Sequence, residues 1–113
     1  AKLVEYFAAR PDKPYLAHHL AMVGDWARRH GIAPQRILLG EFGALRSDAR
    51  YVASHAADRA RYVRDVREAA EAEGFPWAFW NLFDGMGLMD DASKRFDPAI
   101  VTALGLRVPA DDR

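Results

Sequence analysis

The sequence has no cysteine, no excess of charge of either sign and no long apolar run. Without cysteine, disulfides, thiolate nucleophiles and thiolate metal ligands are all excluded. The 16 basic and 16 acidic residues give a formal net charge of zero, so bulk charge indicates neither nucleic acid nor an anionic membrane surface as a partner. No apolar segment approaches the length of a membrane span, and the first residues lack the pattern of a signal peptide. A neutral ligand fits this composition better.

Helical and strand-like patterns alternate along 113 residues, of which 50% are hydrophobic and 12% aromatic, enough for a folded core. The spacing of apolar residues predicts helices at about 3–8, 15–30, 56–73 and 98–104, and short apolar runs predict strands within 37–43 and 75–80. Asp12 and Asp97 are expected to cap helices, and Gly31, Gly74 and Gly105 to end them.

The alternation of helices and strands implies parallel strands joined by right-handed crossovers. Both strands are predicted to be buried on both faces, so they need helices or further sheet on each side. Two strands alone would also leave long unpaired edges, which proteins generally avoid. The chain is therefore expected to be part of a larger α/β body, or to complete one by pairing with a second copy of itself.

A carboxylate lies at the end of the first predicted strand, in the stretch Ile37-Leu38-Leu39-Gly40-Glu41-Phe42-Gly43. The carboxyl ends of parallel strands are where ligands bind in α/β proteins. Gly40 and Gly43 admit unusual backbone angles and close approach, which suits a carboxylate that faces a pocket. The alternative is an ion pair between Glu41 and one of the basic residues. Glu41 is thus the first candidate for a functional residue.

Other polar residues give weaker signals. His18 and His19 are adjacent on a helix and diverge by about 100°, which argues against a shared metal. Three aspartates in a glycine-containing loop, Asp84, Asp90 and Asp91, lack the spacing of an EF-hand, so turn formation explains them better than calcium. The alternating charges of residues 59–73 indicate a solvated helix face. No metal and no cofactor is expected.

Five motifs follow one another between about residues 15 and 106. They are Leu38–Ala44, Asp58–Tyr62, Gly74–Asn81, Met86–Asp90 and Ile100–Leu104. Their joint order is more specific than any one of them, and it resembles the carboxyl-terminal part of the glycoside hydrolase family 5 cellulases. The resemblance implies an α/β fold that is the C-terminal portion of a (β/α)8 TIM barrel, with strands seven and eight and their flanking helices. Residues 1–113 would then form a single incomplete domain.

The resemblance also implies an activity, the retaining hydrolysis of β-1,4-glucan chains of the cellulose type. By this resemblance Glu41 is the nucleophile and Trp80, at the end of strand eight, is a platform beneath the sugar. The implied partner is a β-glucan or related polysaccharide, with neither nucleic acid nor membrane involved. A secreted or periplasmic location rests on the resemblance alone.

The chemistry of Trp80 agrees with such a role. An indole at a strand end offers a flat apolar face of the kind that packs on a sugar ring, with its N–H free to donate. The alternative is a core tryptophan, which suits Trp77 better because the offset within one strand points the two indoles to opposite faces. Asn81 and Asp84 follow Trp80 closely enough to line the same cleft and are further candidates for substrate binding.

The second carboxylate of such enzymes has no counterpart here. In the family an acid/base glutamate lies in an Asn-Glu-Pro motif on strand four, and this sequence contains no Asn-Glu pair. The arginine and histidine of the earlier strands are absent too. A retaining glycosidase needs two carboxyl groups about 5–5.5 Å apart. The chain alone is therefore expected to be inactive and to require the missing N-terminal strands.

A second interpretation belongs to a different class of function. The chain can be a non-catalytic half-barrel that binds carbohydrate or assembles with itself. Glu41 favours the enzyme, because a binding or structural module gives no reason for a carboxylate at that strand end.

Overall fold

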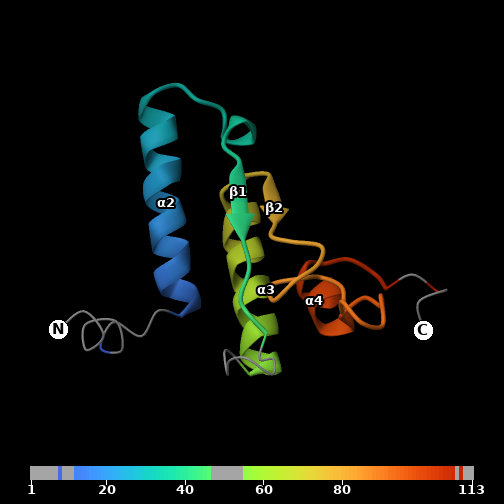
Figure 1. Ribbon diagram of the computed structural model, residues 1–113. Helices are drawn as coiled ribbons and strands as arrows, with labels where there is room; N and C mark the ends of the chain where they lie inside the picture. The colour runs from blue at the N-terminus through green and yellow to red at the C-terminus, as the bar shows by residue number, and fades with distance from the viewer. Residues whose placement is uncertain (1–7, 9–11, 47–54, 109, 111–113) are drawn as a thin grey trace.

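The computed structural model describes residues 8, 12–46, 55–108 and 110 (Figure 1). Its elements, in chain order, are α2 (Lys13–Arg29), the short 3₁₀ helix η1 (Pro34–Arg36), β1 (Leu39–Phe42), α3 (Ala56–Ala72), β2 (Trp77–Phe79) and α4 (Pro98–Ala103). This is the predicted alternation of helices and strands. The helix expected over residues 3–8 and the stretch 47–54 fall largely or wholly outside the described residues. None of the helices in the described part is long and apolar enough to cross a membrane.

The helices begin and end where the sequence signals predict. Asp12 Oδ1 accepts a hydrogen bond from the Tyr15 backbone N–H at 3.3 Å, at the start of α2. Asp97 Oδ1 caps α4 in the same way, accepting from Ala99 N at 3.0 Å and from Ile100 N at 3.3 Å. The glycines expected to stop the helices have positive φ: Gly31 +65°, Gly74 +78° and Gly105 +72°. Local sequence therefore sets the lengths of α2, α3 and α4.

The two strands form a parallel sheet with an irregular register. Leu39 lies opposite Trp77 and Phe42 opposite Phe79, so three steps along β1 match two steps along β2. One extra residue on β1 is the mark of a β-bulge. Because of it, Leu39 and Phe42 both pack toward the core although they are three positions apart. The bulge lies in the part of β1 that contains Glu41.

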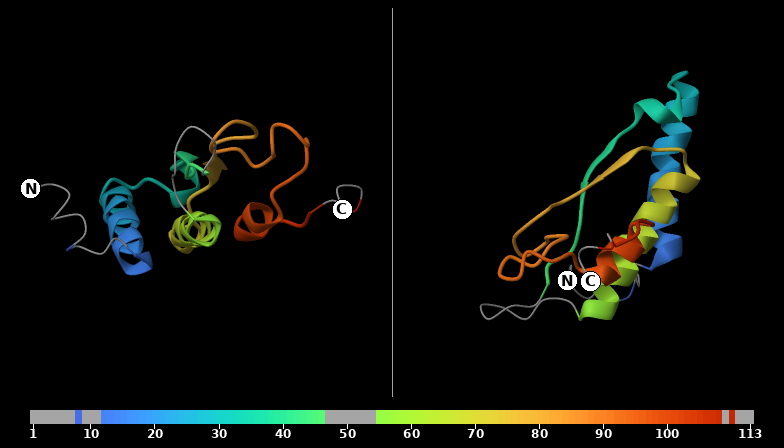
Figure 2. Two further views of the ribbon diagram at one scale, coloured as in Figure 1. Left: turned by 60° about the horizontal axis from the view of Figure 1, so that its bottom comes forward. Right: turned by 90° about the vertical axis from the view of Figure 1, so that its right-hand side faces the viewer.

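The sheet lies on one side of a layer of helices, with α3 between α2 and α4 (Figure 2). The core fills the space between the layers and consists of Phe42, Val63, Val66, Ile100, Ala103 and Leu104. The Phe42 ring meets the rings of Trp77 and Phe79 edge to face, each with centroids 5.8 Å apart. The molecule measures 17 Å along its shortest axis, which leaves room for two layers and no third.

The prediction that both strands are buried on both faces is wrong. Helices cover one face of the sheet, and on the other face Leu38 is 62% exposed and Ala78 is exposed as well. Leu39, Trp77 and Phe79 are half-buried. The apolar residues on the uncovered face have no second layer to pack against within the described chain. β2 is also shorter than predicted, because Pro76 has no N–H for the ladder and contributes its carbonyl to Leu39 N at 2.9 Å.

Candidate active site

The carboxyl ends of β1 and β2 lie in direct contact. The Trp80 backbone N–H donates to the Phe42 carbonyl at 2.8 Å, one residue beyond β2. A Cβ added at Gly43 would lie 2.3 Å from the Trp80 carbonyl oxygen, so glycine is required for this approach. The predicted close approach is thus found at Gly43. At Gly40 an added Cβ would meet nothing nearer than 4.0 Å, and neither glycine has a positive φ, so the expectation of unusual backbone angles is wrong.

Glu41 lies on the uncovered face of the sheet. Its neighbour Phe42 is buried in the core, so Glu41 points to the opposite side, where it is exposed. No hydrogen bond or ion pair engages its carboxylate within the described residues. The ion pair offered as the alternative role for Glu41 is therefore not formed there. Bulges such as the one in β1 often re-aim a side chain next to a functional site.

The two tryptophans of the second strand differ in their surroundings, as predicted. Trp77 packs against the core, and its indole N–H donates to Glu71 Oε1 at 3.1 Å. Trp80 is 48% exposed. Because Trp77 and Phe79 face the helices, Trp80 faces the same open side as Glu41. The core role thus belongs to Trp77, and the Trp80 indole is available to a ligand.

Asn81 and Asp84, the other two predicted site residues, lie in the loop after β2. The Asn81 backbone carbonyl accepts from Leu88 N at 2.8 Å, and its side-chain Oδ1 is buried with no hydrogen-bond partner among the described residues. A buried acceptor of this kind calls for a donor. Asp84 is exposed, has φ +69°, and forms a turn through the Gly87 N–H, which donates to the Asp84 carbonyl at 2.8 Å. The structure thus leaves a free acceptor on Asn81, whereas the Asp84 backbone shapes the loop.

The loop aspartates make turns. The Asp84 N–H donates to Asp91 Oδ1 at 3.1 Å, and Asp90 Oδ1 accepts from the Ser93 N–H and hydroxyl, each at 2.7 Å. The hydrogen bonds from Ser93, the backbone one first, hold the pKa of Asp90 below its usual value. Across the described positions, no group of three or more His, Asp or Glu side chains is placed to hold a metal ion.

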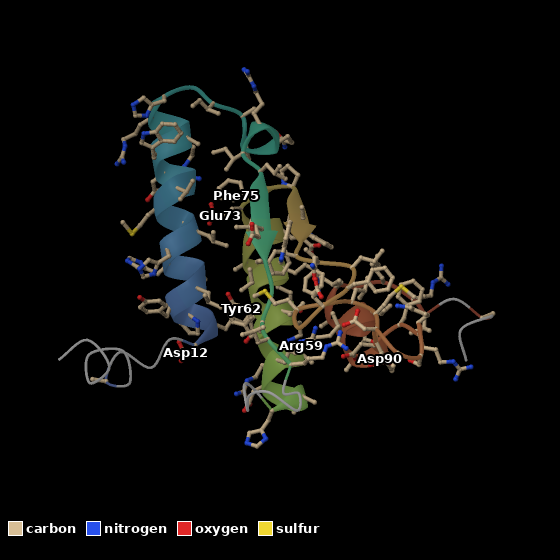
Figure 3. All side chains as sticks on the ribbon, in the orientation of Figure 1. Asp12, Arg59, Tyr62, Glu73, Phe75 and Asp90 are labelled. Atoms are coloured by element: carbon tan, nitrogen blue, oxygen red, sulfur yellow. The ribbon has the colours of Figure 1, made fainter. Side chains whose placement is uncertain are left out.

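One charged residue near the strand ends is buried, contrary to the predicted solvated helix face. Arg59 is 2% exposed and lies on the side of α3 that faces α4 (Figure 3). Its Nε donates to the Ala44 carbonyl at 2.8 Å, and its Nη1 donates to Asp97 Oδ2 at 2.8 Å. Its Nη2 donates to the carbonyls of Met86 at 3.1 Å and Gly87 at 2.8 Å. Burial lowers the pKa of Arg59, and the Asp97 carboxylate opposes this shift.

A signal for the burial of Arg59 is present in the sequence. Arg59 precedes Val63, Val66 and Ala70 at intervals of four, three and four residues, which places it on the apolar stripe of α3. Asp65 is buried as well and accepts from the Arg64 guanidinium at 2.9 Å and 3.0 Å. The alternation of charges along the helix does not predict the burial of either residue, whereas the helical spacing predicts that of Arg59.

Arg46 also joins the two strand ends. Its backbone N–H donates to the Gly85 carbonyl at 2.7 Å. Its Nη2 donates to the carbonyls of Gly87 at 2.5 Å and Met89 at 2.9 Å, and its guanidinium lies 3.7 Å from Asp90. Arg46 and Arg59 thus share the Gly87 carbonyl as an acceptor. The segment after β1 and the loop after β2 are therefore held together by both arginines.

Comparison with known proteins gives matches among solved structures. No protein-family model and no curated protein matches the sequence. A hyperthermophilic endo-β-1,4-glucanase solved with substrate matches 82% of this chain at 31% identity, with a TM-score of 0.68. The cellulose synthase subunit Z of Clostridioides difficile matches 81% at 32% identity, with a TM-score of 0.69. Cel5A of Thermotoga maritima, solved with cellobiose, has the same TM-score at 22% identity and supports the fold alone.

The matches cover much less of the other proteins than of this one. The chain spans 27% of the hyperthermophilic endoglucanase, 28% of the Clostridioides difficile protein and 27% of the Thermotoga maritima enzyme. About three quarters of each neighbour therefore has no counterpart in these 113 residues. The resemblance indicated by the motifs is confirmed: the structural neighbours are family 5 endoglucanases with the TIM-barrel fold, and the chain corresponds to a partial fragment of that fold.

Proposed function

We propose that the chain supplies strands seven and eight of a family 5 (β/α)8 barrel, with residues 1–113 as a single incomplete domain. The parallel pairing of β1 and β2 through the crossover helix α3 supports this position. The helices cover one face of the sheet, as they do on the outside of a barrel, and the open face would line its interior. Glu41 and Trp80 would then lie at the carboxyl end of the barrel, where TIM-barrel enzymes have their active sites.

The proposed reaction is the retaining hydrolysis of β-1,4-glucan chains, with Glu41 as the nucleophile. The observation that carries this proposal is an exposed carboxylate with no partner among the described residues, at the bulged end of β1 beside Trp80. In such a reaction the carboxylate attacks the anomeric carbon, while a second carboxyl group protonates the leaving oxygen. The second group would come from the part of the barrel that this chain does not contain.

Substrate binding is assigned to the residues that follow β2. Trp80 would support a sugar ring on its exposed indole face. Asn81, which is half-buried, and Asp84, which is exposed, would line the same cleft. The hyperthermophilic endo-β-1,4-glucanase, which is 31% identical to this chain, has been solved with its substrate. A β-glucan or a related polysaccharide is accordingly the proposed substrate class.

A second candidate function is supported by the open sheet face. Leu38, just before β1, and Trp80, just after β2, are 62% and 48% exposed, and Leu82 in the following loop is 50% exposed. Each strand of the two-stranded sheet pairs along one edge among the described residues. Exposed apolar strands with free edges associate readily. On this view the chain is a non-catalytic half-barrel that binds carbohydrate or pairs with a second copy of itself.

A completed barrel distinguishes the two functions. The matching quarter of the hyperthermophilic endo-β-1,4-glucanase is replaced by this chain, and hydrolysis of soluble β-glucan is measured for the chimera and for the isolated chain. We expect turnover by the chimera and none by the isolated chain, because general acid catalysis typically contributes about 10² to 10⁴ in rate. Glu41→Gln should abolish turnover, whereas Glu68→Gln, on the helix α3, should retain it. A folded chimera without activity, or one that tolerates Glu41→Gln, would favour the non-catalytic half-barrel.

A further inference from the structure

The guanidinium of Arg59 connects three segments that are distant in sequence. It reaches Ala44 after β1, Met86 and Gly87 after β2, and Asp97 at the start of α4. Its side chain is 3% exposed and forms an ion pair with Asp97, whose side chain is 31% exposed. A charge buried this deeply is tolerated because its donors are satisfied.

The acceptors of Arg59 belong to the segments that carry the candidate site. Ala44 follows Glu41 by three residues, and Met86 and Gly87 lie in the loop that begins after Trp80. Gly87 has no room for a side chain, since an added Cβ would lie 2.7 Å from the Phe83 carbonyl carbon. The Gly87 carbonyl, which accepts from both Arg59 and Arg46, therefore lies in a tight turn. This restricts how far the end of β1 and the loop after β2 can move relative to each other.

We propose that Arg59 is a positioning residue that fixes the end of β1 relative to the loop after β2, and thereby Glu41 relative to Trp80. Arg59 itself is not proposed to touch the substrate. The consequence for hydrolysis rests on the proposed function, whereas the mechanical role of Arg59 does not. Misplacement of reacting groups by about 1 Å can cost on the order of 10²-fold in rate, so a residue that sets this spacing affects turnover without taking part in the chemistry.

Arginine is required for this role, and lysine does not replace it. The planar guanidinium of Arg59 directs donors from three nitrogens to four acceptors on three segments. A lysine ammonium is a compact charge with three donors at one atom, so it can satisfy the Asp97 carboxylate but not the spread of carbonyls. Arg59→Lys therefore keeps the charge and removes the connection between the segments.

Arg67 provides a matched control on the same helix. Its side chain is 15% exposed, its Nε donates to the Ala103 carbonyl at 2.8 Å, and its Nη1 donates to Glu71 at 2.6 Å. Like Arg59 it connects α3 to α4, but its acceptors lie away from both strand ends. Arg67→Lys should therefore loosen the end of α4 and leave the candidate site unchanged.

Amide hydrogen exchange on the chimeric barrel tests the mechanical role. The amides of Arg46 and Leu88 report on the strand ends, because they donate to Gly85 and Asn81, and the amide of Gly105 reports on α4. We expect Arg59→Lys to raise exchange at the first two by about tenfold or more, and Arg67→Lys to raise it at Gly105 alone. Equal effects of the two substitutions, or unprotected strand-end amides in the unaltered, folded chimera, would overturn the proposal.

Kinetics in the chimeric barrel test the consequence for turnover. At a temperature where both variants are folded, Arg59→Lys should lower kcat by about tenfold to a hundredfold with a smaller change in KM. Arg67→Lys should keep kcat within about twofold. The proposal fails if Arg59→Lys lowers the melting temperature but changes kcat no more than Arg67→Lys does. The role of Arg59 would then be structural. An inactive unaltered chimera would count against the proposed function, while the exchange experiment would still decide the role of Arg59.

Discussion

Glu41 has no partner among the described residues, so its replacement should affect chemistry more than folding. In the chimeric barrel, Glu41→Ala should nearly abolish kcat while oligosaccharide still binds, because the proposed role of the side chain is in the covalent step. Azide, a small anion, should restore turnover in the space left by the carboxylate and release the product of opposite anomeric configuration. The rate with and without azide, and the anomer seen by NMR, check this expectation. Near-normal turnover of Glu41→Ala would end the assignment of Glu41 as nucleophile.

Trp80 should affect binding instead. Its indole is expected to contact the sugar in both the ground and the transition state, so Trp80→Ala should lower kcat/KM by about tenfold to a hundredfold, with a smaller loss in kcat than Glu41→Ala produces. Steady-state kinetics of the chimera with cello-oligosaccharides give both constants. Trp26→Ala is the matched control, because Trp26 is similarly exposed, at 45%, but lies on α2 away from the strand ends. Equal losses in the two variants would show that Trp80 is an ordinary surface tryptophan.

Single residues differ in how far the sequence predicts them. The different surroundings of Trp77 and Trp80 follow from the alternation of side chains along a strand, and the structure agrees. The roles of Glu41 and Trp80 in a reaction stay predictions. The burial of Arg59 was missed, because its charge suggested a solvated face although its spacing placed it on the apolar stripe of α3. The spacing indicates that Arg59 faces the core, but it does not identify the acceptors, which lie up to 38 positions away.

At the scale of elements, the contact between the ends of β1 and β2 depends on Gly43. Gly43→Ala places a Cβ 2.3 Å from the Trp80 carbonyl oxygen, so one of the two segments must move. We expect a loss of about 1–3 kcal/mol in the free energy of unfolding of the chimeric barrel, as for other overpacked sites, together with reduced turnover. Gly40→Ala is the matched control on the same strand, since its Cβ would meet nothing nearer than 4.0 Å, and it should change stability by about 0.5 kcal/mol or less. Urea unfolding of both variants measures the difference.

The order of the elements and the ends of the helices could be predicted, whereas the pairing of the strands could not. Caps such as Asp97 and stops such as Gly105 act within one turn, so local sequence determines them. The bulge between Leu39 and Phe42 depends on which residues of β2 lie opposite, and these are more than 30 positions away. The burial of both strand faces was overestimated for a related reason. Apolar residues indicate that a face of the sheet must be covered, but they do not show whether the covering layer belongs to this chain.

At the scale of the whole molecule, the uncovered sheet face should make the isolated chain associate or lose fixed packing. The exposed Leu38 beside β1, the exposed Leu82 in the loop after β2 and the strand edges that pair with no described residue favour contacts between copies. Analytical ultracentrifugation should therefore show a dimer or larger species, or near-ultraviolet circular dichroism should be weak despite the 12% aromatic content. Leu38→Lys should reduce association, whereas a lysine at Met22, which is 55% exposed on α2, should not. A sharp monomer with a strong near-ultraviolet signal and a cooperative melt would contradict this expectation.

The connections made by Arg59 bear on how barrels of this kind can be recombined. Among the described residues, the acceptors of its guanidinium all lie between residues 44 and 97, so these contacts around the candidate site use no other part of a barrel. A crossover that carries residues 41–97 together transfers the proposed site residues with the arginine that is proposed to position them. What remains to be matched is the contact along the two strand edges and the flanking helices. A crossover placed inside α3 would separate Arg59 from the strand or the loop that it joins. Gene shuffling among family 5 enzymes should accordingly yield active progeny more often when its breakpoints fall outside this stretch than within it.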